Sequence, residues 1–92
     1  MLTFPIKRNW FEMIASGEKK EEYRAANGYY DSRLMKYKNE PIWVALRNGY
    51  RNDSDTLYCR VVPVRETAAR PEWGGVPGKM HWSLKILDVR SY

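Results

Sequence analysis

In the stretch GEKKEEYR, residues 17–24, the chain changes from a helical pattern to a strand pattern, with six charged side chains among eight. No apolar face continues at a 3.6-residue period beyond Gly17, so these residues predict a strand rather than more helix. Alternation separates two sets of side chains, with Glu18, Lys20, Glu22 and Arg24 on one side and Lys19, Glu21 and Tyr23 on the other. Since neither side is apolar, we expect this strand at the rim of a sheet or along a polar cleft.

The residues before this stretch predict a helix from about Asn9 to Ser16. Apolar residues recur there at spacings of three and four, namely Trp10, Met13 and Ile14. Asn9 followed three places later by Glu12 resembles a capping box. Gly17 stands where a left-handed residue commonly ends a helix, so the charged stretch begins as the helix ends.

The remaining segments predict strands and one more helix. Residues 2–6 alternate apolar and other side chains around Pro5, as in a short edge strand. Beyond Asn27 and Gly28, residues 30–38 have helical spacing. The segments IWVAL, LYCRVVPV and HWSLKILDV read as strands, and the first two are expected to pair as a hairpin around the turn NGYRNDSD. In the last strand, we expect the side chains of Trp82, Leu84 and Ile86 or of their neighbours to point inward.

Together these segments predict an α+β fold, in which a small mixed sheet curls into a barrel with two short helices near the N-terminus. Residues 66–79, rich in Pro and Gly, predict a long loop, and loops of this length are often functional. The 92 residues contain no repeat or linker and predict a single domain spanning 1–92.

Composition excludes several classes of protein. No segment approaches the roughly 20 apolar residues of a membrane span, and the N-terminus lacks a signal-like apolar run, which favours a soluble cytoplasmic protein with no membrane partner. The single cysteine, Cys59, excludes a disulfide within the chain, and its apolar neighbours favour burial. With one Cys and one His, neither a cofactor nor a structural metal site is predicted, although carboxylates binding Mg loosely remain open.

The charge balance favours a polyanionic partner. The net charge of +5 attracts polyanions at low salt. Aromatic residues alternate with basic ones in YYDSRLMKYK and RNGYR, a mixture suited to stacking bases while holding phosphates. RNA or another single-stranded nucleic acid is therefore an expected partner, and a family resemblance of residues 7–24, described below, adds a nucleoside-type small molecule.

The residues around Gly17 resemble a known family signature. A helix ending in Ile14-Ala-Ser-Gly17 and followed by Lys19, Glu22 and Arg24 is similar to the G-x-K-x-x-E-x-R signature of ASCH (activating signal cointegrator homology) domains. The similarity extends back to Lys7 and, more loosely, forward through residues 30–34. It implies a PUA-like barrel of five or six strands with a cleft lined by Lys19, Glu22 and Arg24.

The resemblance also implies two kinds of activity. ASCH domains are associated with RNA binding, and some members are hydrolases that deacylate N4-acetylcytidine or cleave nucleic acid. In the amidohydrolase branch a threonine nucleophile follows the motif lysine by three places, and Glu22 occupies that place here. A carboxylate cannot replace a hydroxyl nucleophile, but Glu22 can act as a general base toward water, with Lys19 as an amine or oxyanion donor.

From the residues themselves, Lys19 and Arg24 are donors suited to a phosphate or a base carbonyl, and Glu22 accepts from an exocyclic amine. Further binding candidates outside this trio are Lys7, Tyr30, Arg33 and Trp73. Trp73 is either a stacking platform for a base or an anchor that holds its loop against the barrel. Arg33, Lys36 and Lys38 form a basic helix face, which solvation alone would also explain. His81 is interpreted as structural, and Glu66 or Glu72 is available to complete a catalytic pair.

Three functional readings follow. The first is a module that binds RNA, a nucleotide or a modified base in the cleft. The second is a hydrolase that uses Lys19 and Glu22 on a nucleoside or on RNA. The third is a small protein-interaction domain, while a charged network that merely solvates a strand is the plainest explanation of GEKKEEYR. Oligomeric state stays open.

Overall fold

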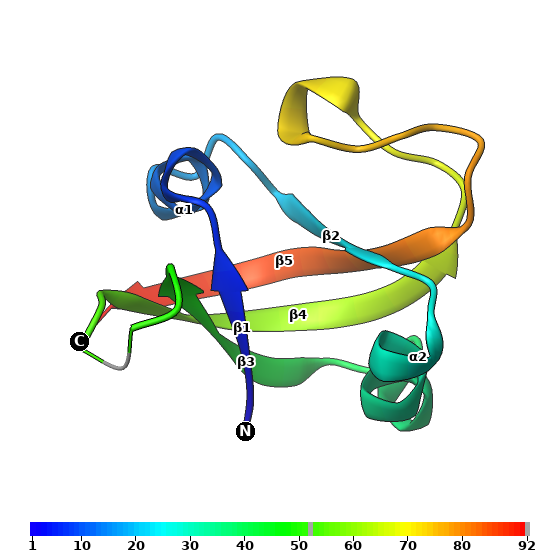
Figure 1. Ribbon diagram of the computed structural model, residues 1–92, viewed down its shortest axis with the longest axis horizontal. Helices are drawn as coiled ribbons and strands as arrows, with labels where there is room; N and C mark the ends of the chain where they lie inside the picture. The colour runs from blue at the N-terminus through cyan, green and yellow to red at the C-terminus, as the bar shows by residue number, and fades with distance from the viewer. Residues whose placement is uncertain (52, 92) are drawn as a thin grey trace.

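Within the residues that the structure describes, five strands form one sheet in the order β1-β3-β4-β5-β2, and two helices lie within the first 37 residues (Figure 1). The structure is a computed structural model that describes residues 1–51 and 53–91. The strands are β1 (Leu2–Ile6), β2 (Glu21–Ala25), β3 (Ile42–Asn48), β4 (Thr56–Glu66) and β5 (His81–Ser91). The helices are α1 (Arg8–Ala15) and α2 (Gly28–Leu34), with 3-10 turns at Met35–Tyr37 and Pro71–Trp73. This arrangement confirms the predicted α+β fold.

The sheet is mixed and strongly curled into a half-barrel. β1 runs parallel to β3, while the pairs β3–β4, β4–β5 and β5–β2 are antiparallel. The predicted hairpin is confirmed, with Val44 opposite Cys59 and Arg47 opposite Thr56; residue 52, in the predicted turn, lies outside the described residues. β1 and β2 are the two edges, and the half-barrel is open between them.

Helix α1 begins one residue earlier than predicted and without the predicted capping box. Lys7 is the cap residue, has an extended backbone and makes no capping hydrogen bond with its side chain. Asn9 lies inside the helix, so the Asn9–Glu12 prediction is wrong. At the other end Gly17 has a φ of 85°, which confirms the left-handed turn. Helix α2 has a side-chain cap, since the Asn27 carboxamide accepts a hydrogen bond from the Tyr30 N–H.

The core fills the inside of the curl. Both helices contribute to it, through Phe11 and Ile14 of α1 and Leu34 of α2. The strands contribute Phe4, Ile6, Val44, Leu46, Leu57, Cys59, Val61, Trp82 and Leu84. Trp82 and Leu84 therefore point inward as predicted, and Ile86 packs against this cluster. Cys59 is fully buried, and desolvation raises the pKa of its thiol to about 12, so it is an unreactive core residue.

The long loop after β4 arches over β2, as Figure 1 shows. It begins after Glu66, contains the 3-10 turn Pro71–Trp73, and ends where β5 begins at His81. Four successive residues of β5, His81 to Leu84, are buried, which shows that both faces of this strand are covered at its start.

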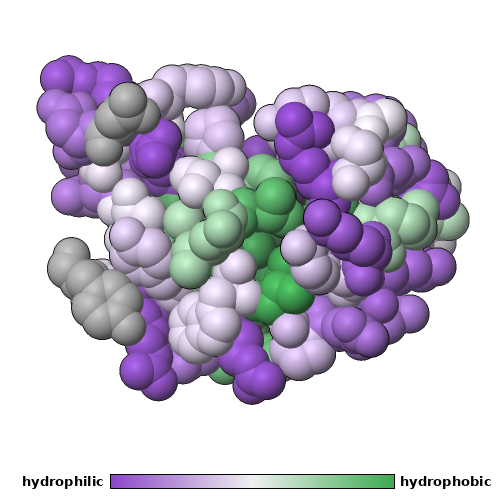
Figure 2. Space-filling view, turned by 90° about the horizontal axis from the view of Figure 1, so that it is seen from below, coloured by the Kyte–Doolittle hydropathy of each residue, from purple (hydrophilic) through white to green (hydrophobic). Residues whose placement is uncertain are grey.

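The outer surface combines apolar and hydrophilic areas. Seen from below, hydrophobic residues gather in the middle of the face, with hydrophilic residues around them (Figure 2). Within residues 1–51 and 53–91, no helix has the length and apolar character needed to cross a membrane.

Candidate functional site

The charged stretch forms a buried ion triad at the open side of the half-barrel. Lys19 Nζ lies 3.3 Å from Glu22 Oε1, and Arg24 Nη2 lies 2.7 Å from Glu22 Oε2. Lys19 and Glu22 are 2% and 5% exposed, and the Arg24 side chain is 12% exposed. A carboxylate and two cations that are buried together hold one another in fixed positions. The triad is therefore a rigid polar group rather than a solvated strand face.

The geometry corrects one detail of the sequence prediction. Alternation separated Lys19 from Glu22, but β2 begins only at Glu21. Residues 18–20 are not part of the strand, so alternation does not apply to them. Lys19 turns toward Glu22, while Glu22 and Arg24 share a side as predicted.

Lys19 connects the triad to the long loop. Its ammonium donates a hydrogen bond to the Trp73 carbonyl at 2.5 Å and lies 4.9 Å from the ring centroids of both Trp10 and Tyr23. Desolvation lowers the pKa of Lys19, although the neighbouring Glu22 carboxylate opposes this shift. Its donors are thus directed at the protein, and its position holds the loop against β2.

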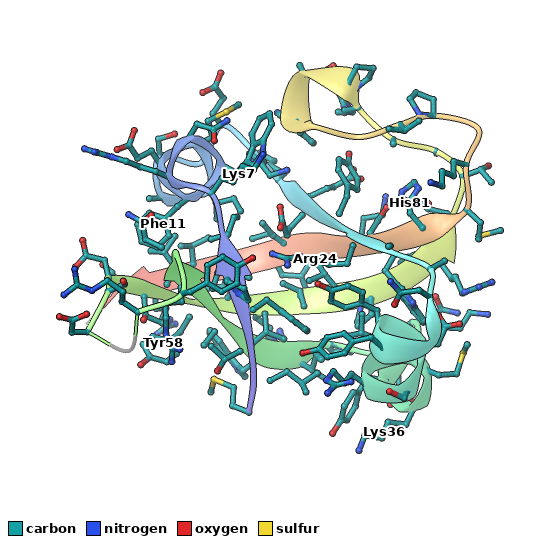
Figure 3. The ribbon with its side chains drawn as sticks, in the orientation of Figure 1. Lys7, Phe11, Arg24, Lys36, Tyr58 and His81 are labelled. Atoms are coloured by element: carbon teal, nitrogen blue, oxygen red, sulfur yellow. The ribbon has the colours of Figure 1, made fainter. Side chains whose placement is uncertain are left out.

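Arg24 connects the two edges of the sheet. From β2, its Nη2 donates to the Pro5 carbonyl of β1 at 2.7 Å, and its Nη1 donates to the Tyr30 hydroxyl at 3.2 Å. The guanidinium carbon lies 5.4 Å from the Phe4 ring centroid. Figure 3 shows Arg24 in the middle of the molecule, between β1 and β2. The planar fork of an arginine is suited to making these several bonds at once.

A cleft of about 400 Å³ opens beside Arg24, between the end of β1 and β2. Glu22 and Arg24 lie at its inner end because both are largely buried, whereas Lys7 and Arg8 are exposed at its rim. The aromatic rings of Trp10 and Tyr50 also line it, and Tyr50 is 87% exposed. The other lining residues are Pro5, Ile6, Asn48 and Gly49.

The cleft brings together some of the predicted site residues but not all. Lys7, Glu22 and Arg24 line it, and Tyr30 adjoins it through its bond to Arg24. Lys19 lies behind Glu22 and does not belong to the lining.

The remaining candidates lie elsewhere. Arg33 stacks on Tyr29, with its guanidinium carbon 3.4 Å from the ring centroid, and hydrogen-bonds within α2. The Trp73 ring stacks with Arg70 in the loop, and the Trp73 carbonyl serves as the acceptor for Lys19. The loop is therefore anchored through this residue.

The two acids considered as catalytic partners are engaged in other ion pairs. Glu66 lies 2.7 Å from Lys85, and Glu72 lies 3.4 Å from Arg70. Neither is among the residues that line the cleft.

Among the cleft residues that sequence reasoning missed, three carry a charge or an aromatic ring: Arg8, Trp10 and Tyr50. Trp10 had been assigned to the helix pattern alone. Tyr50 belongs to RNGYR, in which an aromatic residue in a turn is flanked by arginines, and this mixture was the signal that could have identified it. Their meeting depends on how β1 and β3 pair, which no local pattern shows.

His81 has a structural environment, in agreement with its interpretation from the sequence. Its Nδ1 lies 2.8 Å from the Lys79 carbonyl, and its Nε2 lies 2.9 Å from the Ser83 hydroxyl. A histidine beside a serine resembles an activated nucleophile. Ser83 is fully buried, however, so a substrate cannot reach this hydroxyl.

In the part of the chain that the structure describes, no group of three or more His, Cys, Asp or Glu side chains is placed to hold a metal ion. Comparison with known proteins adds no assignment: no family model matches the chain, and neither a curated protein nor a solved structure matches it significantly.

Proposed function

We propose that this protein is a PUA-like domain of the ASCH type that binds single-stranded RNA, or one nucleotide or modified base of it, in the cleft between β1 and β2. The observation that carries the proposal is the buried Glu22–Arg24 pair at the inner end of a cleft with a basic and aromatic rim. A cleft of about 400 Å³ is within the usual size of small-ligand sites.

Each part of the cleft has a role in this proposal. Glu22 accepts a hydrogen bond from an exocyclic amine, and Arg24 donates to a base carbonyl. Lys7 and Arg8 contact phosphate, while Trp10 and Tyr50 offer faces for stacking a base. Lys19 acts indirectly, by fixing the Glu22 carboxylate and by holding the loop that contains Trp73.

The resemblance of residues 7–24 to the ASCH signature supports the same proposal in part: of the three motif residues that it implies for the cleft, Glu22 and Arg24 line it, whereas Lys19 does not. An RNA ligand in turn favours an intracellular location.

Binding is favoured over hydrolysis because the Lys19 amine is directed at Trp73 and Glu22 rather than into the cleft. A hydrolytic role would then rest on Glu22 alone, acting as a general base toward water. This alternative predicts that the ligand is cleaved, and the experiment below also detects cleavage.

The test is fluorescence anisotropy of a labelled single-stranded RNA across a salt series. A Lys7→Ala/Arg8→Ala variant removes the two rim cations, and Lys36→Ala/Lys38→Ala, on the exposed surface that follows α2, is the control with the same change in net charge. We expect the rim variant to lower affinity about 10-fold and to reduce the salt slope by about 1.4, from about 0.7 for each phosphate contact on a single strand. The control should bind like the wild type.

Equal effects of the two double variants would contradict the proposal, because general charge would then explain binding. The RNA is analysed for cleavage after each titration. RNA that wild type cuts and a Glu22→Gln variant leaves intact would establish the hydrolase in place of the binding module.

A further inference from the structure

The outer face of β3, β4 and β5 carries a second group of aromatic and basic side chains. The register places Trp43 opposite Arg60, and Tyr58 opposite Arg90. Residues directly opposite one another in antiparallel strands point to the same face, as do residues two apart in one strand. These four residues, here called the outer platform, therefore share the face that points away from the core residues Val44 and Cys59.

The outer platform has the chemistry of a surface for single-stranded nucleic acid. Trp43 is 39% exposed, and the Arg90 guanidinium carbon lies 5.8 Å from its ring centroid. Arg60 is exposed and lies opposite Asp88 in the register, and Asp88 forms an ion pair with Arg90 at 3.0 Å. Two arginines with one carboxylate leave the platform positive, and its rings offer faces on which bases stack.

The outer platform is connected to the cleft by β1. Pro5 lines the cleft and is paired with Arg47, which lies on the same face of β3 as Trp43. From β1 across β3 and β4 to β5 is three strand spacings, or about 14 Å. An RNA that leaves the cleft over Pro5 can therefore reach the outer platform within a few nucleotides.

We propose that the outer platform binds the continuation of an RNA strand whose one nucleotide occupies the cleft, so that the ligand is a single-stranded segment rather than an isolated nucleotide. This inference rests on the proposed function for the identity of the ligand. Charge complementarity favours RNA over a second copy of the chain, because a symmetric dimer through this face would set its arginines against each other in a protein of net charge +5.

The experiment compares a labelled trinucleotide with a labelled ten-nucleotide RNA. The platform variant is Trp43→Leu/Arg60→Gln, and the rim variant is Lys7→Ala/Arg8→Ala. We expect the platform variant to bind the ten-nucleotide RNA about 10-fold more weakly, with the salt slope reduced by about 0.7 for one arginine, and to bind the trinucleotide like the wild type. The rim variant should weaken binding of both. Thermal unfolding followed by circular dichroism verifies that each variant is folded.

A platform variant that binds the ten-nucleotide RNA like the wild type would overturn the inference. Loss of self-association in that variant, measured by sedimentation and without any change in RNA binding, would also overturn it and assign the face to a protein partner. If only the platform variant binds the ten-nucleotide RNA more weakly than the wild type, RNA binding at the platform is supported and the cleft proposal fails. If only the rim variant binds this RNA more weakly, the cleft proposal is supported and the platform proposal fails.

Discussion

Lys19 is an ammonium group with almost no contact with water, and its partners explain how it is tolerated. A buried charge is costly unless it is paired and hydrogen-bonded. The Glu22 carboxylate supplies the opposite charge, the Trp73 carbonyl accepts a hydrogen bond, and the rings of Trp10 and Tyr23 face the cation. One side chain therefore contacts helix α1, strand β2 and the long loop.

We expect Lys19→Met to lower the free energy of unfolding by about 3 kcal/mol, because it leaves the Trp73 carbonyl and one Glu22 oxygen without their buried partner. Urea unfolding followed by tryptophan fluorescence measures the change. The matched control is Lys20→Met, at an exposed neighbouring position, which should change stability by less than about 0.5 kcal/mol. Equal effects at the two positions would contradict the structural role of Lys19.

The difference in stability between wild type and Lys19→Met should depend on pH, and the pKa shift of Lys19 defines the direction of this dependence. Desolvation lowers the pKa of Lys19 in the folded state below its ordinary value of 10.5. The unfolded chain therefore binds this proton more tightly, and the folded state gains stability as pH rises toward 10.5. We expect the stability of wild type relative to Lys19→Met to increase over that range. A stability difference between the two proteins that stays constant or shrinks as the pH rises would contradict this prediction.

The residue-level prediction from sequence was partial for a physical reason. Glu22 and Arg24 share a side because alternation within a strand is fixed by the backbone. The position of Lys19 depended instead on where the strand begins, and the turn after Gly17 delays it to Glu21. The sequence identified the three residues of the triad but not which of them face the cleft.

At the scale of elements, Lys85 of β5 joins strands on both sides of it. Its ammonium lies 3.2 Å from Glu21 of β2 and 2.7 Å from Glu66 of β4. Burial alone would raise the pKa of Glu66, but hydrogen bonds from Lys85 and Ser83 lower it below 4.5. Burial alone would lower the pKa of Lys85, but its two carboxylate partners raise it.

This arrangement predicts an acid-sensitive contribution to the sheet. Because the pKa of Glu66 is lowered in the folded state, its stabilisation is present above pH 4.5 and is lost as pH falls through the folded pKa. Glu66→Gln should make stability fall less steeply as the pH falls from about 5 through this ordinary pKa of 4.5 and below it. In a double-mutant cycle with Lys85→Met at pH 7, we expect a coupling of about 0.5–1 kcal/mol, the size typical of partly exposed pairs. If the stability of Glu66→Gln fell with decreasing pH as steeply as that of the wild type, this role of Glu66 would be refuted.

The long loop depends on one close approach to β2. A Cβ added to Gly75 would lie 2.5 Å from the Ala69 Cβ and 2.9 Å from Tyr23 Cε2, so Gly75→Ala forces the loop away from the strand. We expect a loss of about 1–3 kcal/mol, the usual cost of overpacking, and faster proteolysis within residues 67–80. Gly28→Ala is the control, since no atom lies within 4 Å of a Cβ there and the residue is helical. It should be neutral or slightly stabilising; a similar loss at both glycines would contradict the argument.

The elements themselves were well predicted because their signals are local. Apolar alternation identified β1 and β5, and runs of β-branched and aromatic residues identified β3 and β4. The sequence predicts a break at Asn27-Gly28 and a helix over 30–38, whereas α2 begins at Gly28, ends at Leu34 and continues as a 3-10 turn to Tyr37. The start of α1 was misjudged because Asn9 and Glu12 satisfy a capping pattern in sequence, while the backbone already turns helical at Arg8. Propensity alone does not choose between two neighbouring starting points.

At the scale of the whole molecule, Arg24 closes a sheet that does not close itself. The sheet ends at β1 and β2, and Arg24 bridges these two edges through the Pro5 carbonyl. We expect Arg24→Lys to lower stability by about 1–3 kcal/mol, because an ammonium cannot reproduce the arginine fork. Hydrogen exchange should accelerate in β1 and β2 while β4 stays protected.

The control for this change is Arg33→Lys, whose hydrogen bonds remain within α2. It should change stability by less than about 0.5 kcal/mol. Uniform acceleration of exchange across all five strands in Arg24→Lys would mean that Arg24 does not act at the edges.

The position of the open side was the part of the sheet that sequence could not predict. The predicted curled sheet is confirmed as a half-barrel, and its open side contains the cleft. That side exists because β1 pairs in parallel with β3 and because β2 pairs with the distant β5. Such long-range pairings leave no trace in the spacing of neighbouring residues.

The strand order also determines how late in translation the sheet can form. β2 emerges early, but among the described residues it pairs only with β5, the fifth strand along the chain. Glu21 therefore has no Lys85 opposite it until that strand is made. Until about nine-tenths of these residues have been translated, the polar ribbon that carries Glu22 and Arg24 has no partner on which to dock. A nascent chain arrested before His81 would contain both Glu22 and Arg24 and yet be unable to assemble the cleft.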